Sequence, residues 1–108
     1  MIRQAYICGS YTAGSPQGVL HNVRLAAIAA GRLASGGILP ICPHVQDTHF
    51  GSWDEAMRKC RMAICAMDKD RDALVVLPGW ERSKGSREEV ELAHVIGLPV
   101  VTIHEALQ

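Results

Sequence analysis

Short apolar runs alternate along the chain with longer stretches in which apolar residues recur every three or four positions. Each run is bounded by glycine, proline or polar residues, as buried strands are. Strands are therefore expected over residues 4–9, 38–42, 72–77 and 99–103. The run 72–77 is apolar after Asp72, which indicates burial on both faces, as in a parallel sheet. Pro40 favours an edge position for its strand, because proline has no N–H to donate to a neighbouring strand.

The intervals between these strands have helical spacing. Residues 18–35 predict a first helix, whose apolar stripe comprises Val19, Val23, Ala26, Ala27, Ala30 and Leu33. Ser52 can cap a second helix over 53–67, with Glu55 as the partner in a capping box. The apolar side of that helix comprises Met57, Cys60, Met62, Ala63, Ile64 and Met67. Residues 85–97 predict a third helix, and the last five residues can begin another.

This alternation of strands and helices predicts an α/β fold. Parallel strands with right-handed crossovers form a small doubly wound, three-layer sandwich with a four-stranded sheet in the order 2-1-3-4. Ligands bind such sheets beyond the carboxyl ends of the strands, where the strand order reverses. Here that point lies between the first and third strands. The loops 9–17, 43–52 and 78–84 are all expected at this edge.

Composition narrows the class of protein. The 108 residues correspond to one domain, and eleven Lys and Arg balance eleven Asp and Glu, which argues against binding a nucleic-acid polymer. No apolar run approaches the roughly 20 residues that span a bilayer, and the first residues lack a signal-peptide layout. No C-x-x-C pair occurs among Cys8, Cys42, Cys60 and Cys65. We therefore expect reduced, mostly buried thiols in a cytoplasmic protein without membrane partners.

The first two loops carry polar chemistry with more than one interpretation. Residues 9–15 combine hydroxyls, glycines and backbone N–H groups before a helix, which suits a phosphate or makes a flexible polar turn. They match neither G-x-G-x-x-G nor a P-loop. The second loop contains Cys42, His44, Asp47 and His49, a mixture that zinc sites use. Their spacing matches no recurring zinc site, so we expect substrate contact or ordinary loop polarity, with no metal and no cofactor.

The third loop leads into a helix that begins with Gly85 and Ser86. Glu88, Glu89 and Glu91 lie in its first turns, where the helix dipole favours carboxylates. Either these glutamates only complement the dipole, or one of them faces the ligand edge of the sheet. Trp80, beside a glycine at the mouth of this loop, can stack on a base or sugar, or can belong to the core or an interface.

Two separated segments resemble the nucleoside 2-deoxyribosyltransferase superfamily. The first runs Tyr6-Ile7-Cys8-Gly9-Ser10-Tyr11 and is followed, after a helix, by Pro43-His44. The second is Gly85-Ser86-Arg87-Glu88-Glu89, followed by Ala93, Gly97 and Pro99. In the family signature a glycine precedes the nucleophilic glutamate by four positions, and an alanine, a glycine and a proline follow at four, eight and ten; only Glu89 fits these offsets. The resemblance spans nearly the whole chain.

The resemblance implies roles for particular residues. Glu89 corresponds to the nucleophile and Tyr6 to the tyrosine that hydrogen-bonds it. The expected substrate-binding residues are Gly9, Ser10, Tyr11, His44, Trp80, Ser83, Gly85 and Ser86. Transferases of the family often have an aspartate that contacts the base six positions before the nucleophile, and this chain has Ser83 at that position. Cys60 or Ile64 falls near the family's acidic residue on the second helix.

The expected function is cleavage or transfer at the N-glycosidic bond of a nucleoside or nucleoside 5′-monophosphate. A non-catalytic module that binds a nucleotide or NAD derivative is the alternative, and a purely structural domain is a third. Serine hydroxyls at Ser10, Ser83 and Ser86 favour a phosphate-bearing ligand. The expected helices carry apolar faces too large for the sheet to cover, with Leu25, Ile28 and Met57 on them. Because relatives in the resembled family also form dimers or higher assemblies, we expect a homo-oligomer, most simply a two-fold dimer.

Overall fold

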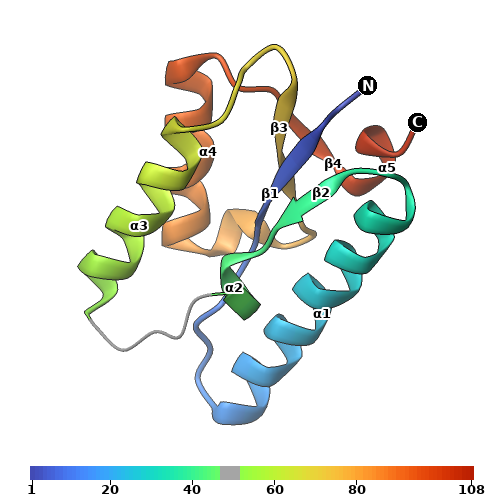
Figure 1. Ribbon diagram of the computed structural model, residues 1–108. Coiled ribbons are helices and arrows are strands. Elements are labelled where there is room, and N and C mark those ends of the chain that lie inside the picture. The colour runs from blue at the N-terminus through green and yellow to red at the C-terminus, as the bar shows by residue number, and fades with distance from the viewer. Residues whose placement is uncertain (47–51) are drawn as a thin grey trace.

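The computed structural model describes residues 1–46 and 52–108 and contains a four-stranded parallel sheet (Figure 1). The strands are β1 (Gln4–Cys8), β2 (Leu39–Ile41), β3 (Asp72–Val76) and β4 (Val100–Thr102). Their order is β2-β1-β3-β4, and every pair is parallel, which confirms the predicted sheet. Pro40 lies on the edge strand β2, as its missing N–H requires.

The helices begin and end close to the predicted positions. They are α1 (Pro16–Ser35), α2 (Pro43–Gln46), α3 (Trp53–Cys65), α4 (Lys84–Ile96) and α5 (Ile103–Ala106), with a 3₁₀ turn, η1, at Trp80–Arg82. Serine side chains cap the first turns of the three long helices at Ser15, Ser52 and Ser83. The turns α2 and η1 lie in segments expected to be loops. Pro43 has the φ angle that suits a first helical position, and Gly79, at φ 86°, turns the chain into η1.

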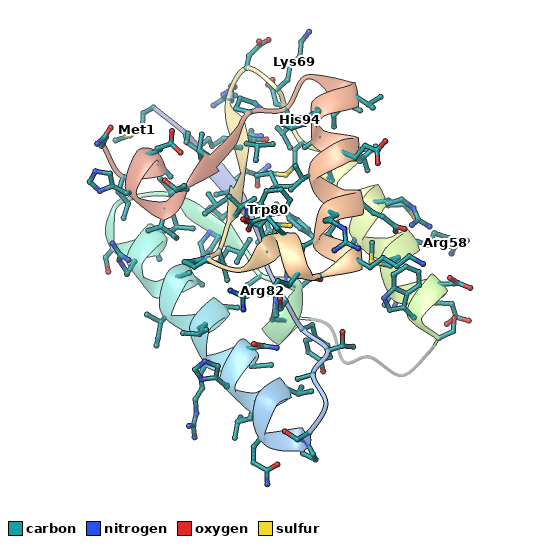
Figure 2. All side chains as sticks on the ribbon, turned by 180° about the vertical axis from the view of Figure 1, so that it is seen from behind. Met1, Arg58, Lys69, Trp80, Arg82 and His94 are labelled. Atoms are coloured by element: carbon teal, nitrogen blue, oxygen red, sulfur yellow. The ribbon has the colours of Figure 1, made fainter. Side chains whose placement is uncertain are left out.

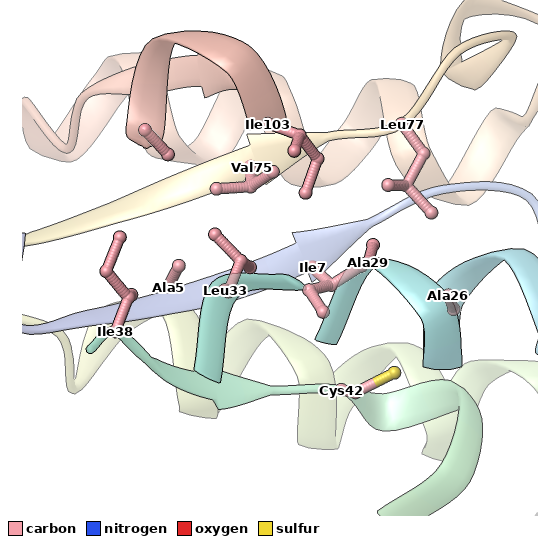
Figure 3. Close-up of a cluster of buried hydrophobic side chains, with 11 residues drawn as sticks. Ala5, Ile7, Ala26, Ala29, Leu33, Ile38, Cys42, Val75, Leu77 and Ile103 are labelled. Carbon is pink, nitrogen blue, oxygen red and sulfur yellow. The ribbon is translucent and has the colours of Figure 1, made fainter. Parts of the chain in front are cut away.

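Each face of the sheet is covered by helices and has its own core. Helices α1 and α5 cover one face, where the buried cluster comprises Ala5, Ile7, Ala26, Ala29, Leu33, Ile38, Cys42, Val75, Leu77, Ile103 and Ala106 (Figure 3). Helices α3 and α4 cover the other, with Tyr6, Cys8, Ile64, Met67, Leu74, Val76, Val90, Ala93 and Leu98. Because successive strand residues point to opposite faces, Tyr6 and Cys8 of β1 both face α3 and α4.

Several predicted core positions are wrong. In α1 the buried residues are Ala26, Ala29 and Leu33, whereas Ala27 is exposed because one residue turns the helix by about 100°. In α3 Met62 is exposed, since it lies two residues from the buried Ile64 and so on the other side of the helix. None of the four cysteines forms a disulfide, but only Cys8 and Cys42 are buried, while Cys60 is partly buried and Cys65 exposed.

The amino end of the sheet is held by a buried carboxylate. Asp72, at the start of β3, accepts hydrogen bonds from Arg3 Nε (3.1 Å) and Nη2 (2.9 Å), from Gln4 Nε2 (2.9 Å) and from the Asp68 main-chain N–H (2.8 Å). Burial alone raises the pKa of Asp72, but these hydrogen bonds and the Arg3 charge outweigh it and lower the pKa to about 2. The Arg3–Asp72 pair therefore stabilises the edge opposite the predicted ligand site.

Candidate functional site

A cavity of about 490 Å³ lies beyond the carboxyl ends of β1 and β3. Four segments supply its lining: the loop after β1, the start of α2, the first turns of α3 and the first turns of α4. The lining residues are Gly9, Tyr11, Thr12, Pro43, His44, Ser52, Trp53, Ala56, Met57, Cys60, Ser83, Lys84, Gly85, Ser86 and Glu89. The cavity thus occupies the place where doubly wound sheets bind ligands.

Glu89 is the buried carboxylate of this cavity. It lies in the second turn of α4, with only 6% of its surface exposed. The Tyr6 hydroxyl donates a hydrogen bond to its Oε2 at 2.5 Å, and the Cys8 thiol lies 3.4 Å from its Oε1. The alternation of β1 positions both donors, because Tyr6 and Cys8 point to the α4 side of the sheet. Glu88 and Glu91 are not among the cavity-lining residues.

Burial raises the pKa of Glu89 above its ordinary value. Hydrogen bonds from Tyr6, Cys8 and Cys60 act in the opposite direction, and the charge of Glu88 adds to the rise. Burial and the charge of Glu89 raise the pKa values of Tyr6 and Cys8 as well, so both keep their protons. The Glu89 carboxyl group is therefore surrounded by neutral donors, which hold it in place.

The N-terminus of α4 offers polar groups beside Glu89. Ser86 is 2% exposed and lines the cavity, and its Oγ has no hydrogen-bond partner within the described chain. Ser83 Oγ already accepts the Ser86 N–H at 3.2 Å, as the helix cap. The first N–H groups of any helix lack acceptors within it, so this end of α4 suits an anion. An unpaired buried hydroxyl is costly unless a ligand completes its hydrogen bonds, which makes Ser86 a candidate contact.

Two glycines of the predicted site allow close packing at the cavity. A Cβ on Gly9 would lie 2.9 Å from Leu77 Cδ1, so a larger residue would require the Leu77 side chain to shift. A Cβ on Gly85 would lie 3.1 Å from Met57 Sδ, across the contact between α4 and α3. Met57 is accordingly buried and lines the cavity, so its expected place on an uncovered face is wrong; Leu25 and Ile28 are exposed as expected.

His44 holds the loop that follows β1. Its Nε2 lies 3.2 Å from the carbonyl oxygen of Gly9 and 3.0 Å from that of Ser10. Carbonyl oxygens only accept, so Nε2 carries the proton. The Tyr11 ring packs against the imidazole, with 5.8 Å between the centroids. Tyr11 and His44 both line the cavity, whereas Ser10 does not.

Besides Tyr11, the cavity is lined by the aromatic side chain of Trp53, which sequence reasoning did not select. Trp80 is partly buried against the core between the sheet and helices α3 and α4, and it is not among the cavity-lining residues, so the substrate-stacking role expected for it is not supported (Figure 2). Trp53 begins α3, is 43% exposed and lines the cavity, with Lys84 Nζ 5.0 Å from its ring centroid. Its position directly after the helix cap Ser52 was the available signal, because that helix start faces the ligand edge.

The described residues contain no metal-ligand cluster and no membrane-spanning helix. Within residues 1–46 and 52–108, no three His, Cys, Asp or Glu side chains are grouped so that they could hold a metal ion. Cys42 points into the core beneath α1 (Figure 3), and Asp47 and His49 lie outside the described residues. No helix in the described part of the chain is long and apolar enough to cross a bilayer.

Comparison with known proteins gives a family but no activity. No curated protein matches the chain. One family does match, over residues 5–102, and its description is a domain of unknown function. The match begins in β1 and ends in β4, so it includes every strand and all residues that line the cavity. The chain therefore belongs to the DUF4406 family.

Proposed function

We propose that the protein cleaves, or transfers a sugar at, the N-glycosidic bond of a nucleoside 5′-monophosphate or a nucleoside. The observation that carries this proposal is the buried Glu89 carboxylate, which lines the cavity and accepts a hydrogen bond from Tyr6. These are the two residues to which the resemblance to nucleoside 2-deoxyribosyltransferases assigns the nucleophile and its partner. The proposal places the reaction in the cytoplasm.

The proposed chemistry uses the ionised form of Glu89, which the hydrogen bonds from Tyr6 and Cys8 hold in place. Breaking an N-glycosidic bond develops positive charge on the sugar, as in glycoside hydrolysis. In the proposed reaction an oxygen of Glu89 attacks the anomeric carbon, and the bonding electrons leave with the base, which takes up a proton from solvent water. Water, or a second base, then attacks the same carbon and releases Glu89. The Nε2 proton of His44 is shared with main-chain carbonyls, so His44 is assigned to holding the loop rather than to protonating the base.

The two halves of the cavity suit the two ends of a nucleotide. The polar half lies at the N-terminus of α4, where Ser86 Oγ and main-chain N–H groups can bind a 5′-phosphate. The apolar half belongs to α3, where Trp53, Ala56 and Met57 can pack against a base. Glu89 follows the polar half along α4, and its hydrogen bond with Tyr6 ties it to the sheet at the floor of the cavity.

A panel of nucleosides and nucleoside 5′-monophosphates, screened for release of the free base by chromatography, tests the proposal. We expect base release, and we expect monophosphates to bind at least about tenfold more tightly than nucleosides, since each hydrogen bond to a charged group contributes about 1.5–3 kcal/mol. Ser86→Ala should reduce this preference. Thermal stabilisation by nucleotides without base release would favour the binding-module alternative. Equal affinity for the two ligand series would contradict the phosphate assignment.

Trp53→Ala is expected to weaken nucleotide binding about tenfold, because stacking on an aromatic ring contributes about 1–3 kcal/mol per base. Isothermal titration with a monophosphate measures the change. The matched control is Trp80→Ala, which removes the same side chain from the core and should lower the melting temperature instead. Unchanged affinity in folded Trp53→Ala protein would exclude Trp53 from the binding surface.

We also propose a homo-oligomer, most simply a two-fold dimer. The support is the outer surface of α1, where the apolar side chains of Leu25 and Ile28 are 45% and 61% exposed. The resemblance also favours assembly, since related transferases form dimers or higher oligomers. A monomer at micromolar concentration in sedimentation would contradict it.

A further inference from the structure

The thiol of Cys8 has one proton and two acceptors within reach. The side chain is fully buried in β1, and its Sγ lies 3.4 Å from Glu89 Oε1 and 3.6 Å from the main-chain oxygen of Ser86. A thiol donates a single hydrogen bond, so the two contacts cannot both be donated at once. The other carboxylate oxygen of Glu89 is occupied by the Tyr6 hydroxyl. The destination of the Cys8 proton therefore depends on which acceptor is stronger.

We propose that Cys8 is a positioning residue whose S–H proton turns from the Glu89 carboxylate to the Ser86 carbonyl when Glu89 loses its charge. An ionised carboxylate is the better acceptor, because hydrogen bonds to charged groups are about twice as strong as those between neutral groups. Once Glu89 is protonated or esterified, the amide carbonyl of Ser86 becomes the better acceptor. The Cys8 hydrogen bond is then kept in both states, and no buried donor is left unsatisfied.

A weak donor is better suited to this position than a strong one. A donor that binds the ground-state carboxylate tightly also lowers its reactivity, since only interactions that strengthen in the transition state accelerate a reaction. A thiol orients Oε1 while stabilising the charge less than a hydroxyl would. The titratable groups facing Glu89 are Tyr6 and Cys8 of β1, Cys60 of α3 and Glu88 of its own helix. Because burial raises the pKa of Cys8, its thiol stays protonated while Glu89 titrates.

The S–H stretching band of the intact protein tests the movement directly, because few other groups of a protein absorb in that region of the infrared spectrum. As the pH rises through the ionisation of Glu89, the Cys8 band is expected to move to lower frequency, which reports a stronger hydrogen bond. Cys8→Ala assigns the band by removing it. Glu89→Gln should abolish its pH dependence. A Cys8 band that stays fixed while Glu89 titrates would overturn the proposal.

Titration of Glu89 by carbon NMR of labelled carboxyl groups gives the matching measurement. Cys8→Ser is expected to lower the pKa of Glu89 by about one unit, because a hydroxyl is a stronger donor to the carboxylate than a thiol. Cys8→Ala is expected to raise it by a similar amount, because it deletes the donor. The control is Cys42→Ser, the same change at a buried thiol in the other core. Shifts in the same direction for both Cys8 variants, or an equal shift in the control, would contradict the proposal.

The movement of the proton rests on geometry, while its effect on turnover rests on the proposed function. If Cys8→Ser does not fold, the wild-type infrared measurement and Cys8→Ala still decide the question. A pH-dependent S–H band in a protein that releases no base would retain the positioning role and reject the glycosidase. Base release by a protein whose S–H band does not change with pH would retain the glycosidase and reject the positioning role of Cys8.

Discussion

Glu89→Gln is expected to reduce base release by about 10³-fold or more, the size of loss seen when a catalytic group is removed. Glutamine has the same shape, but its neutral amide can neither attack the anomeric carbon nor stabilise positive charge on the sugar. Nucleotide binding should persist, because the phosphate and base contacts are assigned to other residues. Single-turnover base release, compared with the Kd from calorimetry, separates the two effects.

The control for this prediction is Glu91→Gln, which changes an exposed carboxylate of the same helix that does not line the cavity. It should leave turnover near the wild-type level. Folded Glu89→Gln protein with near wild-type turnover would show that Glu89 is not the nucleophile. Loss of binding together with turnover would show instead that Glu89 positions the ligand.

The same substitution should alter the pH dependence of stability. The pKa of Glu89 is raised in the folded state, so the folded protein retains this proton at pH values where the unfolded chain has lost it. The wild type therefore loses stability as the pH rises from the ordinary glutamate pKa of 4.5 through the raised value. The loss is about 1.4 kcal/mol for each tenfold difference in proton affinity between the folded and unfolded states. Glu89→Gln removes this loss, so its stability relative to the wild type should increase over that window.

Asp72→Ala is expected to lower the free energy of unfolding by about 1–3 kcal/mol at neutral pH, because it removes the acceptor from its hydrogen-bonding partners, of which the Arg3 side chain is 46% exposed and can be hydrated instead. Those partners are the Arg3 guanidinium, the Gln4 amide and the Asp68 main-chain N–H. Urea denaturation followed by circular dichroism measures the change. Base release per folded molecule should be unchanged, since Asp72 lies at the opposite end of β3 from the cavity.

The effect of Asp72→Ala should depend on pH in the sense opposite to that of Glu89. The pKa of Asp72 falls from 3.8 to about 2 on folding, so its contribution is present above the unfolded value and is lost as the pH falls through the folded one. The difference between wild type and variant should therefore shrink in acid. Asp70→Ala, the same change at an exposed aspartate nearby, should cost little at any pH. An equal loss in both variants would contradict the special role of Asp72.

The strand order could be predicted from the sequence because the physical rules at each step leave few alternatives. Continuous apolar runs require a covered parallel sheet, and Pro40 excludes a central position for its strand. The short helix α2 was missed because four residues carry too little periodicity to predict it. Ala27 was wrongly predicted to face the core, because alanine occurs on both the buried and the exposed side of helices and so does not indicate which side faces the core.

The candidate site was predictable only in part. Glu89 and Tyr6 were singled out by the resemblance to the nucleoside 2-deoxyribosyltransferases. The local pattern predicts only that the start of α4 faces the ligand edge, and it does not distinguish Glu89 from Glu88 and Glu91. The sequence left Trp80 open between stacking on a ligand and a place in the core, and the structure packs it against the core. Which tryptophan lines the cavity depends on tertiary packing at the start of α3. The contact between Cys8 and Glu89 depends likewise on the register of β1 with β3, where Cys8 pairs with Val76.

The two buried carboxylates occupy opposite ends of the sheet, and this separation affects how the protein tolerates substitution. Asp72 supports folding at one edge, while Glu89 lies beside the cavity at the other, and they share no hydrogen-bond partner among the described residues. Substitutions around the cavity can therefore change ligand preference without weakening the Arg3–Asp72 pair. Laboratory libraries directed at α3 and the start of α4 should therefore retain a high proportion of folded variants.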